Sequence, residues 1–270
     1  MKSYLSLVPI SAKVRKRQNR MTILCVIISI FLVTAIFSVA DMMIRTQSDR
    51  MTGKNGSWHI ELDGISQETA LKIAERDDVV SIGAVTIFNP DGELPYRMDG
   101  KRVVLYGIDE SYLTMNSTGA AEGRFPQGMG EIMLSSNAAR VLQVAVGDTV
   151  TLRTPSGDWD FTVSGLGGVE ESYYSGQYSL MDAYLPRTAF AALMEQNNVH
   201  NLQTSYYVQF TSASKAAKAI PELTAQHNLP ENAVSENTGV MAIAGHSDSS
   251  AAKNVYSLAA VLFVLVLLAG

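Results

Sequence analysis

The sequence predicts a membrane-anchored α+β protein. Its extracytoplasmic part is expected to be a ferredoxin-like split βαβ subdomain that carries an inserted β-rich subdomain and is flanked by transmembrane helices. Two observations predict the flanking helices: an uncharged apolar run at residues 22–40 and a second at 255–270. A third predicts the fold between them, because two similar strand–helix–strand patterns stand near the two ends of that region.

The first apolar run is long enough to cross a bilayer as a helix. At 1.5 Å per residue, residues 22–40 reach about 28 Å, close to the roughly 30 Å of the hydrocarbon core. We therefore expect a transmembrane helix at 21–44. The alternative is a cleavable signal peptide, since Ser38-Val39-Ala40 resembles a cleavage site. The run exceeds the 7–15 residues usual for a signal core, which favours an uncleaved anchor.

The charges on either side of this run differ in sign. Residues 1–20 carry six basic residues and no acid, whereas residues 41–253 carry fifteen basic residues and all twenty-six acids. Because basic segments stay on the cytoplasmic side, we expect a cytoplasmic amphipathic lead at 1–20 and an extracytoplasmic domain at 45–254. The acidic exported part argues against a nucleic-acid partner. Cys25 is the only cysteine, which excludes an intrachain disulfide and a cysteine metal cluster.

The second apolar run spans only sixteen residues, or about 24 Å as a helix. We expect residues 255–270 to be the start of an incomplete second transmembrane helix. The sequence is then the N-terminal part of a longer membrane protein.

Residues 57–94 and 201–238 are expected to form the α/β subdomain. The first segment has strands at 57–62 and 79–88 around a helix capped by Ser66. The second has a strand at 205–210, a helix capped by Thr211 or Ser212, and a closing strand at 232–236. Pro221 predicts a kink or an early stop in that helix. The alternative is a coincidental similarity of two ordinary βαβ units.

The inserted subdomain is expected at residues 95–200, where short strands and turns predominate. The predicted strands lie at 102–107, 131–134, 149–153, 159–164 and 183–186. The third and fourth form a hairpin with a four-residue connection at 155–158. Ser135 or Ser136 caps a short helix, and a longer helix follows at 187–196.

The sequence lacks the common catalytic motifs. The four histidines do not show zinc-site spacing, and neither a P-loop nor a G-x-S-x-G elbow occurs. His246-Ser247-Asp248 has the residue types of a hydrolase triad, but sequence neighbours cannot adopt that geometry by themselves. Gly165-Leu166-Gly167-Gly168 opens no predicted helix, so it does not indicate a dinucleotide site. We therefore expect a non-enzymatic protein with no catalytic, cofactor-binding or metal residues. Four tyrosines are either ordinary packing residues or part of a partner surface: Tyr173, Tyr174, Tyr178 and Tyr184.

Several motifs together resemble the MacB/FtsX-like permeases of ABC transporters. A basic lead runs directly into the first apolar helix at 15–24. In the exported part, EGRFP at 122–126 precedes GEIMLS at 130–135, VGDTV at 146–150 and FTVSG at 161–165. Their order and spacing are similar to the signature of the family's extracytoplasmic core domain. The residues QVAV at 143–146 replace the usual Leu-Gly, so the end of the preceding helix is expected to differ.

The resemblance implies a four-helix permease subunit in the cell membrane that works as a homodimer or with a paired permease. It implies a separate ABC ATPase subunit as partner, and a mechanism in which ATP-driven motion in the cytoplasm passes through the helices to the external domain. No cofactor is implied, and the cargo cannot be read from the residues. The alternative is a membrane-anchored sensor or ligand-binding domain of a signalling receptor. A third possibility, a secreted hydrolase, would require cleavage after Ala40 and a recognisable nucleophile.

Overall fold

The structure is a computed structural model that describes residues 16–88, 95–116, 120–167, 181–230 and 232–247. The chain forms two compact units. The first comprises Met1–Asp49 and Ile243–Gly270, and the second comprises Arg50–Ala242. Residues 1–15 of the predicted basic lead, and the whole of the second predicted span at 255–270, lie outside the described residues.

The first unit contains most of helix α2 (Lys16–Asn55), a single helix of 40 residues. Its segment Arg20–Val39 is long and apolar enough to cross a membrane, with a mean hydropathy of 2.8, and none of it is buried. Large side chains such as Ile27 and Phe31 are exposed along it, as expected for a surface that contacts lipid. The hydroxyls of Ser29 and Thr34 donate to carbonyls one turn earlier, which satisfies them within the helix.

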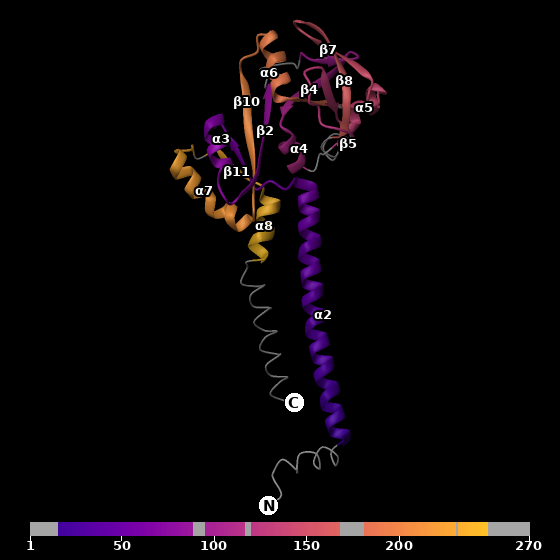
Figure 1. Cartoon of the computed structure of the whole chain (residues 1–270), viewed down its shortest axis with the longest axis vertical. Coiled ribbons are helices and arrows are strands. Elements are labelled where there is room, and N and C mark those ends of the chain that lie inside the picture. Colours follow the sequence, from indigo (N-terminus) through magenta and orange to yellow (C-terminus); the bar gives the residue numbers. More distant parts are fainter. Residues whose placement is uncertain (1–15, 89–94, 117–119, 168–180, 231, 248–270) are drawn as a thin grey trace, which may run out of the picture. The chain divides into compact units, whose positions relative to one another are not determined.

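The second unit begins with the predicted ferredoxin-like layer. Its four strands are β1 (Ile60–Asp63), β2 (Val79–Phe88), β10 (Leu202–Phe210) and β11 (Val234–Glu236). They lie in the order β11-β1-β10-β2, and every neighbouring pair is antiparallel. Strands β1 and β2 are therefore parallel, with β10 between them, which is the split βαβ arrangement. Helices α3 (Gln67–Ala74) and α7 (Ala213–His227) lie on the same side of this layer (Figure 1).

The alternation of residues in these strands explains the layer. Ile60 and Leu62 are completely buried under the two helices, while Glu61 and Asp63 point to the other face and are half-buried. Ser66 caps α3 by accepting from the backbone nitrogen of Thr69 at 3.1 Å, as predicted.

Helix α7 confirms one expectation of the sequence and overturns another. Of the two candidate caps, Ser212 is the one that accepts from the start of this helix. Of the two effects predicted at Pro221, a kink or an early stop, the early stop is wrong, because the helix continues to His227. Pro221 lies on the exposed side, where water can satisfy the carbonyl that the missing N–H leaves unpaired.

The inserted region continues the same sheet, which has eleven strands within the described residues. Its strands are β3 (Arg97–Met98), β4 (Lys101–Ile108), β5 (Ala120–Gly123), β6 (Glu131–Leu134), β7 (Thr149–Thr154), β8 (Gly157–Gly167) and β9 (Met181–Pro186). Its helices are α4 (Glu110–Met115), α5 (Ser136–Leu142) and α6 (Arg187–Gln196), and α8 (Thr238–Ser247) follows β11. The seam between the two regions is narrow, because β2 and β4 are paired only at residues 85–87 and 106–108.

The predicted four-residue connection of the β7–β8 hairpin is wrong. Thr154 is paired with Gly157, so only Pro155 and Ser156 connect the strands. Gly157 takes a φ of 135°, and its carbonyl accepts a bond of 2.8 Å from the Thr154 hydroxyl. A residue expected in the turn therefore opens the second strand, because glycine alone adopts this backbone angle readily.

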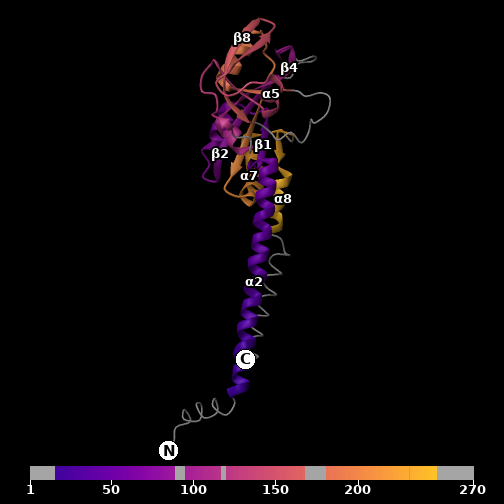
Figure 2. The ribbon, with the colours of Figure 1, turned by 90° about the vertical axis from the view of Figure 1, so that its right-hand side faces the viewer.

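Three clusters of buried side chains hold the unit together. One lies under α3 and α7, and a larger one fills the inserted region around Phe190 and Tyr96. The third joins the two regions through Val85, Ile108, Leu113, Met133 and Tyr184. Strand β8 and helix α7 lie at opposite ends of this unit (Figures 1 and 2), so the two larger clusters are separate bodies of packing.

Candidate functional site

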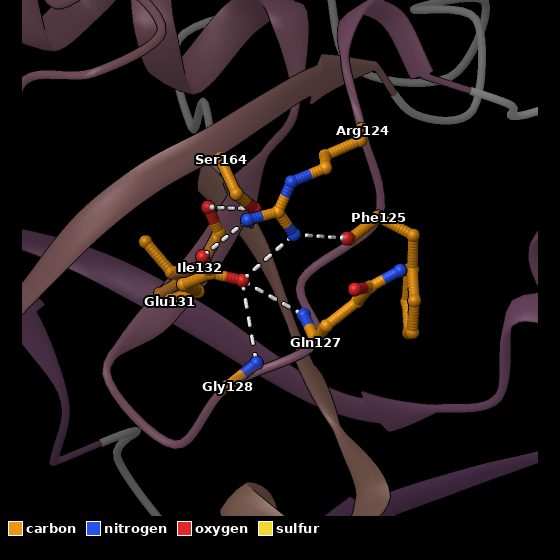
Figure 3. A network of polar contacts seen from close by, with 7 residues as sticks. All are labelled: Arg124, Phe125, Gln127, Gly128, Glu131, Ile132 and Ser164. Atoms are coloured by element: carbon orange, nitrogen blue, oxygen red, sulfur yellow. Dashed lines mark hydrogen bonds and ion pairs between the residues drawn. The ribbon is translucent and has the colours of Figure 1, made fainter.

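The motifs of the inserted region meet at a charged contact between Arg124 and Glu131 (Figure 3). Arg124 follows β5, and Glu131 is the first residue of β6. The guanidinium donates to both carboxylate oxygens, at 2.9 Å and 2.5 Å. The backbone nitrogens of Gln127 and Gly128 also donate to the carboxylate, at 2.8 Å and 3.3 Å. Glu131 thereby closes the whole loop from 124 to 131.

These donors set the electrostatics of the loop. The Arg124 guanidinium and the backbone N–H of Gln127 lower the pKa of Glu131 to about 2. Glu131 raises the pKa of Arg124 in turn. Both groups are therefore charged throughout the physiological range, and neither is available as a proton donor or acceptor at neutral pH.

Two glycines allow the backbone at residues 123–124 to pack directly against the backbone at residues 164–165. Gly123 has a φ of 72°, and a Cβ there would lie 2.3 Å from the Ser164 carbonyl oxygen. A Cβ on Gly165 would lie 2.4 Å from the Arg124 carbonyl oxygen. The Arg124 nitrogen donates to Ser164 O at 2.9 Å. The backbones of the EGRFP and FTVSG motifs are therefore in direct contact, and a side chain at Gly123 or Gly165 would clash with the other motif.

The other motif residues form caps and turns. Ser135, rather than Ser136, caps α5 by accepting from Ala138 N at 3.1 Å. The end of α5 is formed by Gln143 at a φ of 57°, the left-handed conformation that glycine adopts most easily. Asp148 accepts from Ala145 N at 2.8 Å and holds the following turn. These motif residues therefore specify local backbone geometry.

The sequence model of the MacB-like periplasmic core domain matches residues 21–226. The chain belongs to this family. It is a membrane-anchored relative of ABC transporter permeases, with an extracytoplasmic domain that has the family's α+β fold. No curated protein matches the chain.

Solved structures of low sequence identity are similar in fold. One is the extracellular domain of the noncanonic ABC-type transporter YknZ from Gram-positive bacteria, with 14% identity and a TM-score of 0.46 over 66% of this chain and 98% of that chain. Another is the periplasmic region of MacB from Actinobacillus actinomycetemcomitans, with 14% identity and a TM-score of 0.48 over 74% of this chain and 96% of that chain.

The residue types considered for catalysis are not assembled in the described part of this MacB-like chain. His59 is buried, its Nδ1 accepts from Phe210 N at 3.1 Å, and burial lowers its pKa. His246 and Ser247 end α8, and Asp248 lies outside the described residues. Within those residues, no three His, Cys, Asp or Glu side chains are grouped so that they could hold a metal ion. The segment 165–167 of the glycine-rich stretch belongs to β8.

Of the four tyrosines considered for a partner surface, only Tyr184 lies in the described residues. Tyr184 is buried and stacks on Tyr106 with ring centroids 5.4 Å apart, which makes it a core residue. Tyr173, Tyr174 and Tyr178 lie outside the described residues.

A hollow near the seam between the two regions is lined by a pair of charged side chains. Arg187, the first residue of α6, lies over the Tyr206 ring at 5.8 Å and 3.4 Å from an Asp109 oxygen. Asp109 also accepts from Ala84 N at 3.1 Å, which connects α4 to β2. Because the opposite charges balance, this cluster braces the seam and does not favour a charged ligand.

The ion pair between Arg124 and Glu131 was not predicted from the sequence, although a seven-residue separation of opposite charges around a turn is a usable signal. No role was predicted for Asn237 either, which is 4% exposed and lies between β11 and α8. A buried asparagine just before a helix does have a detectable sequence signal, because asparagine is a favoured helix cap.

Proposed function

We propose that this chain is the non-enzymatic permease subunit of a MacB-type ABC transporter. Its role is to couple ATP hydrolysis by a separate cytoplasmic ATPase subunit to a conformational change of the extracytoplasmic domain, for export or mechanotransmission. It works as a homodimer or beside a paired permease in the plasma membrane. The family membership and the apolar segment Arg20–Val39 support this proposal.

The observation that carries the proposal is the continuity of α2. The helix runs without interruption from Lys16 through the apolar segment to Asn55, and only four residues separate it from the start of β1 at Ile60. A membrane anchor needs only about 20 apolar residues. Helix α2 has 40 residues, so it is much longer than anchoring alone requires. A helix that continues through the membrane boundary can pass an axial or rotational displacement to the strand that follows it.

The charge pattern supports a cytoplasmic N-terminus for this permease. Residues 1–20 carry six basic residues and none of the acids. Basic residues near a membrane helix stay on the cytoplasmic side, so the acidic domain lies outside. A cytoplasmic ATPase would then meet the end of the protein that is opposite to the domain.

The continuity can be broken without removing the anchor. Four glycines inserted after Gln47 in the full-length permease should uncouple the domain, since glycine is a poor helix former. ATP-dependent hydrogen exchange of the external domain should disappear, while the ATPase still co-purifies. Four alanines at the same place are the matched control, because they add about 6 Å of helix but restore the helical phase to within roughly 40°.

The outcomes separate the proposal from its alternatives. Retained coupling in the glycine variant would show that a helical connection is not needed. Failure of the unmodified permease to retain any ATPase would reject the transporter assignment as a whole.

A further inference from the structure

The two helices that enter the second unit are joined at one buried side chain. Helix α2 ends at Asn55 and helix α8 begins at Thr238, and Asn237 lies directly before the latter. The Asn237 Nδ2 donates to the carbonyl of Asn55 at 3.1 Å and to the carbonyl of Trp58 at 2.9 Å. All of these residues belong to the Arg50–Ala242 unit.

The same residue also caps α8 and anchors the strands. Its Oδ1 accepts from Val240 N at 3.4 Å in the first turn of α8. Its backbone nitrogen donates to the His59 carbonyl at 2.9 Å, just before β1. Strand β11, which ends at Glu236, is paired with β1 through Ile60. One asparagine therefore contacts the end of α2, the start of α8 and the base of the β1–β11 pair.

Close packing reinforces these bonds. A Cβ on Gly239 would lie only 2.0 Å from the Asn55 Nδ2, so the first turn of α8 rests against the last residue of α2. Gly56, at a φ of 81°, ends α2 with a bond from its nitrogen to the Thr52 carbonyl at 2.9 Å. The chain therefore turns sharply at the point where Asn237 binds it.

We propose that Asn237 is a positioning residue that makes the end of α2 and the start of α8 move as one body and passes their displacement to β1 and β11. The inference rests on the proposed function. An amide suits this role because it offers two donors and an acceptor. A carboxylate would place negative charge against two carbonyl oxygens, and a shorter side chain would not reach both.

Asn197 provides a matched control in the inserted region. Its Nδ2 donates to Leu193 O at 2.7 Å at the end of α6, and its Oδ1 accepts from Ser156 N at 3.0 Å. It has the same chemistry as Asn237, with a backbone donor and a backbone acceptor, but it contacts neither α2 nor α8.

The test uses the full-length permease with its ATPase in lipid nanodiscs. Hydrogen exchange is measured with and without ATP plus vanadate, for the wild type, Asn237→Asp and Asn197→Asp. We expect wild type and Asn197→Asp to show an ATP-dependent difference at residues 57–63 and 232–236. In Asn237→Asp this difference should be lost while ATP hydrolysis continues.

Each outcome decides one statement. Absence of any difference in the wild type would reject the proposed function itself. A difference retained in Asn237→Asp, or lost equally in Asn197→Asp, would overturn the role of Asn237 and leave the proposed function standing.

A second variant covers the case in which Asn237→Asp loses protection in β6 and β8 and is simply misfolded. Asn237→Ser keeps a hydroxyl that can cap α8, but it is too short to donate to both the Asn55 and the Trp58 carbonyl. Its loss of the ATP-dependent difference, with normal protection in β6 and β8, would support the inference. Normal coupling in this variant would overturn it.

Discussion

The two regions of the extracytoplasmic domain are assembled in different ways. The α/β layer combines segments far apart in the chain, since Ile60 is paired with Val208 and with Glu236. The inserted region comes from one continuous segment between β2 and β10. A disturbance that enters through the two chain ends of the domain therefore reaches the α/β layer through β1 and β11. It also reaches the inserted region directly, because the Ser57 nitrogen donates to the Met115 carbonyl at the end of α4.

The polar contacts that stabilise the two regions also differ in burial and in charge. The α/β layer contains two neutral polar groups in the interior, Asn237 and His59, which are 4% and 7% exposed. It also has half-buried ion pairs at Arg76. The inserted region relies on an ion pair at the surface, in which the Arg124 side chain is 53% exposed. Buried neutral bonds are insensitive to salt and costly to leave unmade, whereas exposed ion pairs are weak and screened.

The largest expected effect comes from breaking the core of the inserted region. Phe190 on α6 is completely buried in the larger cluster. Phe190→Ala should lower the free energy of unfolding by about 3–5 kcal/mol, through lost transfer energy and the cavity left behind. If the narrow seam separates the regions, hydrogen exchange should accelerate in β4, β8 and β9 and remain nearly unchanged in β1 and β10.

The reciprocal variant is Leu62→Ala, which removes a completely buried side chain from the other cluster. It should cost about 2–5 kcal/mol and accelerate exchange mainly in β1 and β10. Equal acceleration across both regions in either variant would show one cooperative unit, and the distinction drawn between the regions would be wrong.

The next effect concerns the seam. Gly83 on β2 allows α4 to pack against the strand, and a Cβ there would lie 2.3 Å from the Tyr112 backbone nitrogen. Because backbone cannot rotate away, Gly83→Ala should destabilise the domain by about 1–3 kcal/mol and affect both regions. Gly130→Ala is the control, since nothing lies within 4 Å of its added Cβ. Thermal unfolding of both variants measures the difference, and equal melting temperatures would contradict the packing argument.

The sequence predicted the parts of this fold that local patterns determine. Alternation at Ile60–Asp63 and caps at Ser66 and Ser135 each follow from a few neighbouring residues, and the structure confirms them. The pairing of the two strand–helix–strand units could also be predicted, because both have the same length and order.

What the sequence did not predict depends on contacts between distant residues. Helix α4 has only six residues, and β5 reads AAEG without strand-forming side chains, so neither has a local pattern. The contact between Asn237 and Asn55 joins residues 182 positions apart. No periodicity in the sequence reports such a bond, because it exists only after the layer has formed.

A smaller effect tests the buried histidine of the α/β layer. Burial lowers the pKa of His59 below its ordinary value of 6.5, so the unfolded chain binds a proton more readily than the folded one. Stability should therefore fall as the pH drops below about 6.5, by a few degrees of melting temperature. His59→Asn keeps an acceptor near Nδ1 and should show less of this decrease. His200→Gln, at an exposed position, is the control.

The comparison between variants is needed because another group acts in the opposite direction. Burial raises the pKa of Asp182 to about 6, so acidification through this range stabilises the folded state at that residue. The difference between wild type and His59→Asn isolates the histidine. If the melting temperatures of the two proteins fell equally on acidification, His59 would not be the cause of the decrease.

The smallest expected effect is at the surface ion pair of the inserted region. Glu131→Gln should lower the melting temperature by only about 1–3 °C, because the pair is solvent-exposed, although the lost backbone acceptor adds to it. Since the pKa of Glu131 is lowered to about 2, its contribution is present above pH 4.5 and is lost as the pH falls towards 2. The difference from wild type should also shrink in 1 M salt. Asp158→Asn is the control, since Arg153 and Asp158 make a single contact of 3.4 Å between exposed side chains. If Glu131→Gln lowered the melting temperature as much as Phe190→Ala, and if salt did not change this effect, the contrast between the polar contacts of the two regions would be refuted. The inserted region would then depend on this ion pair as strongly as the α/β layer depends on its buried hydrogen bonds.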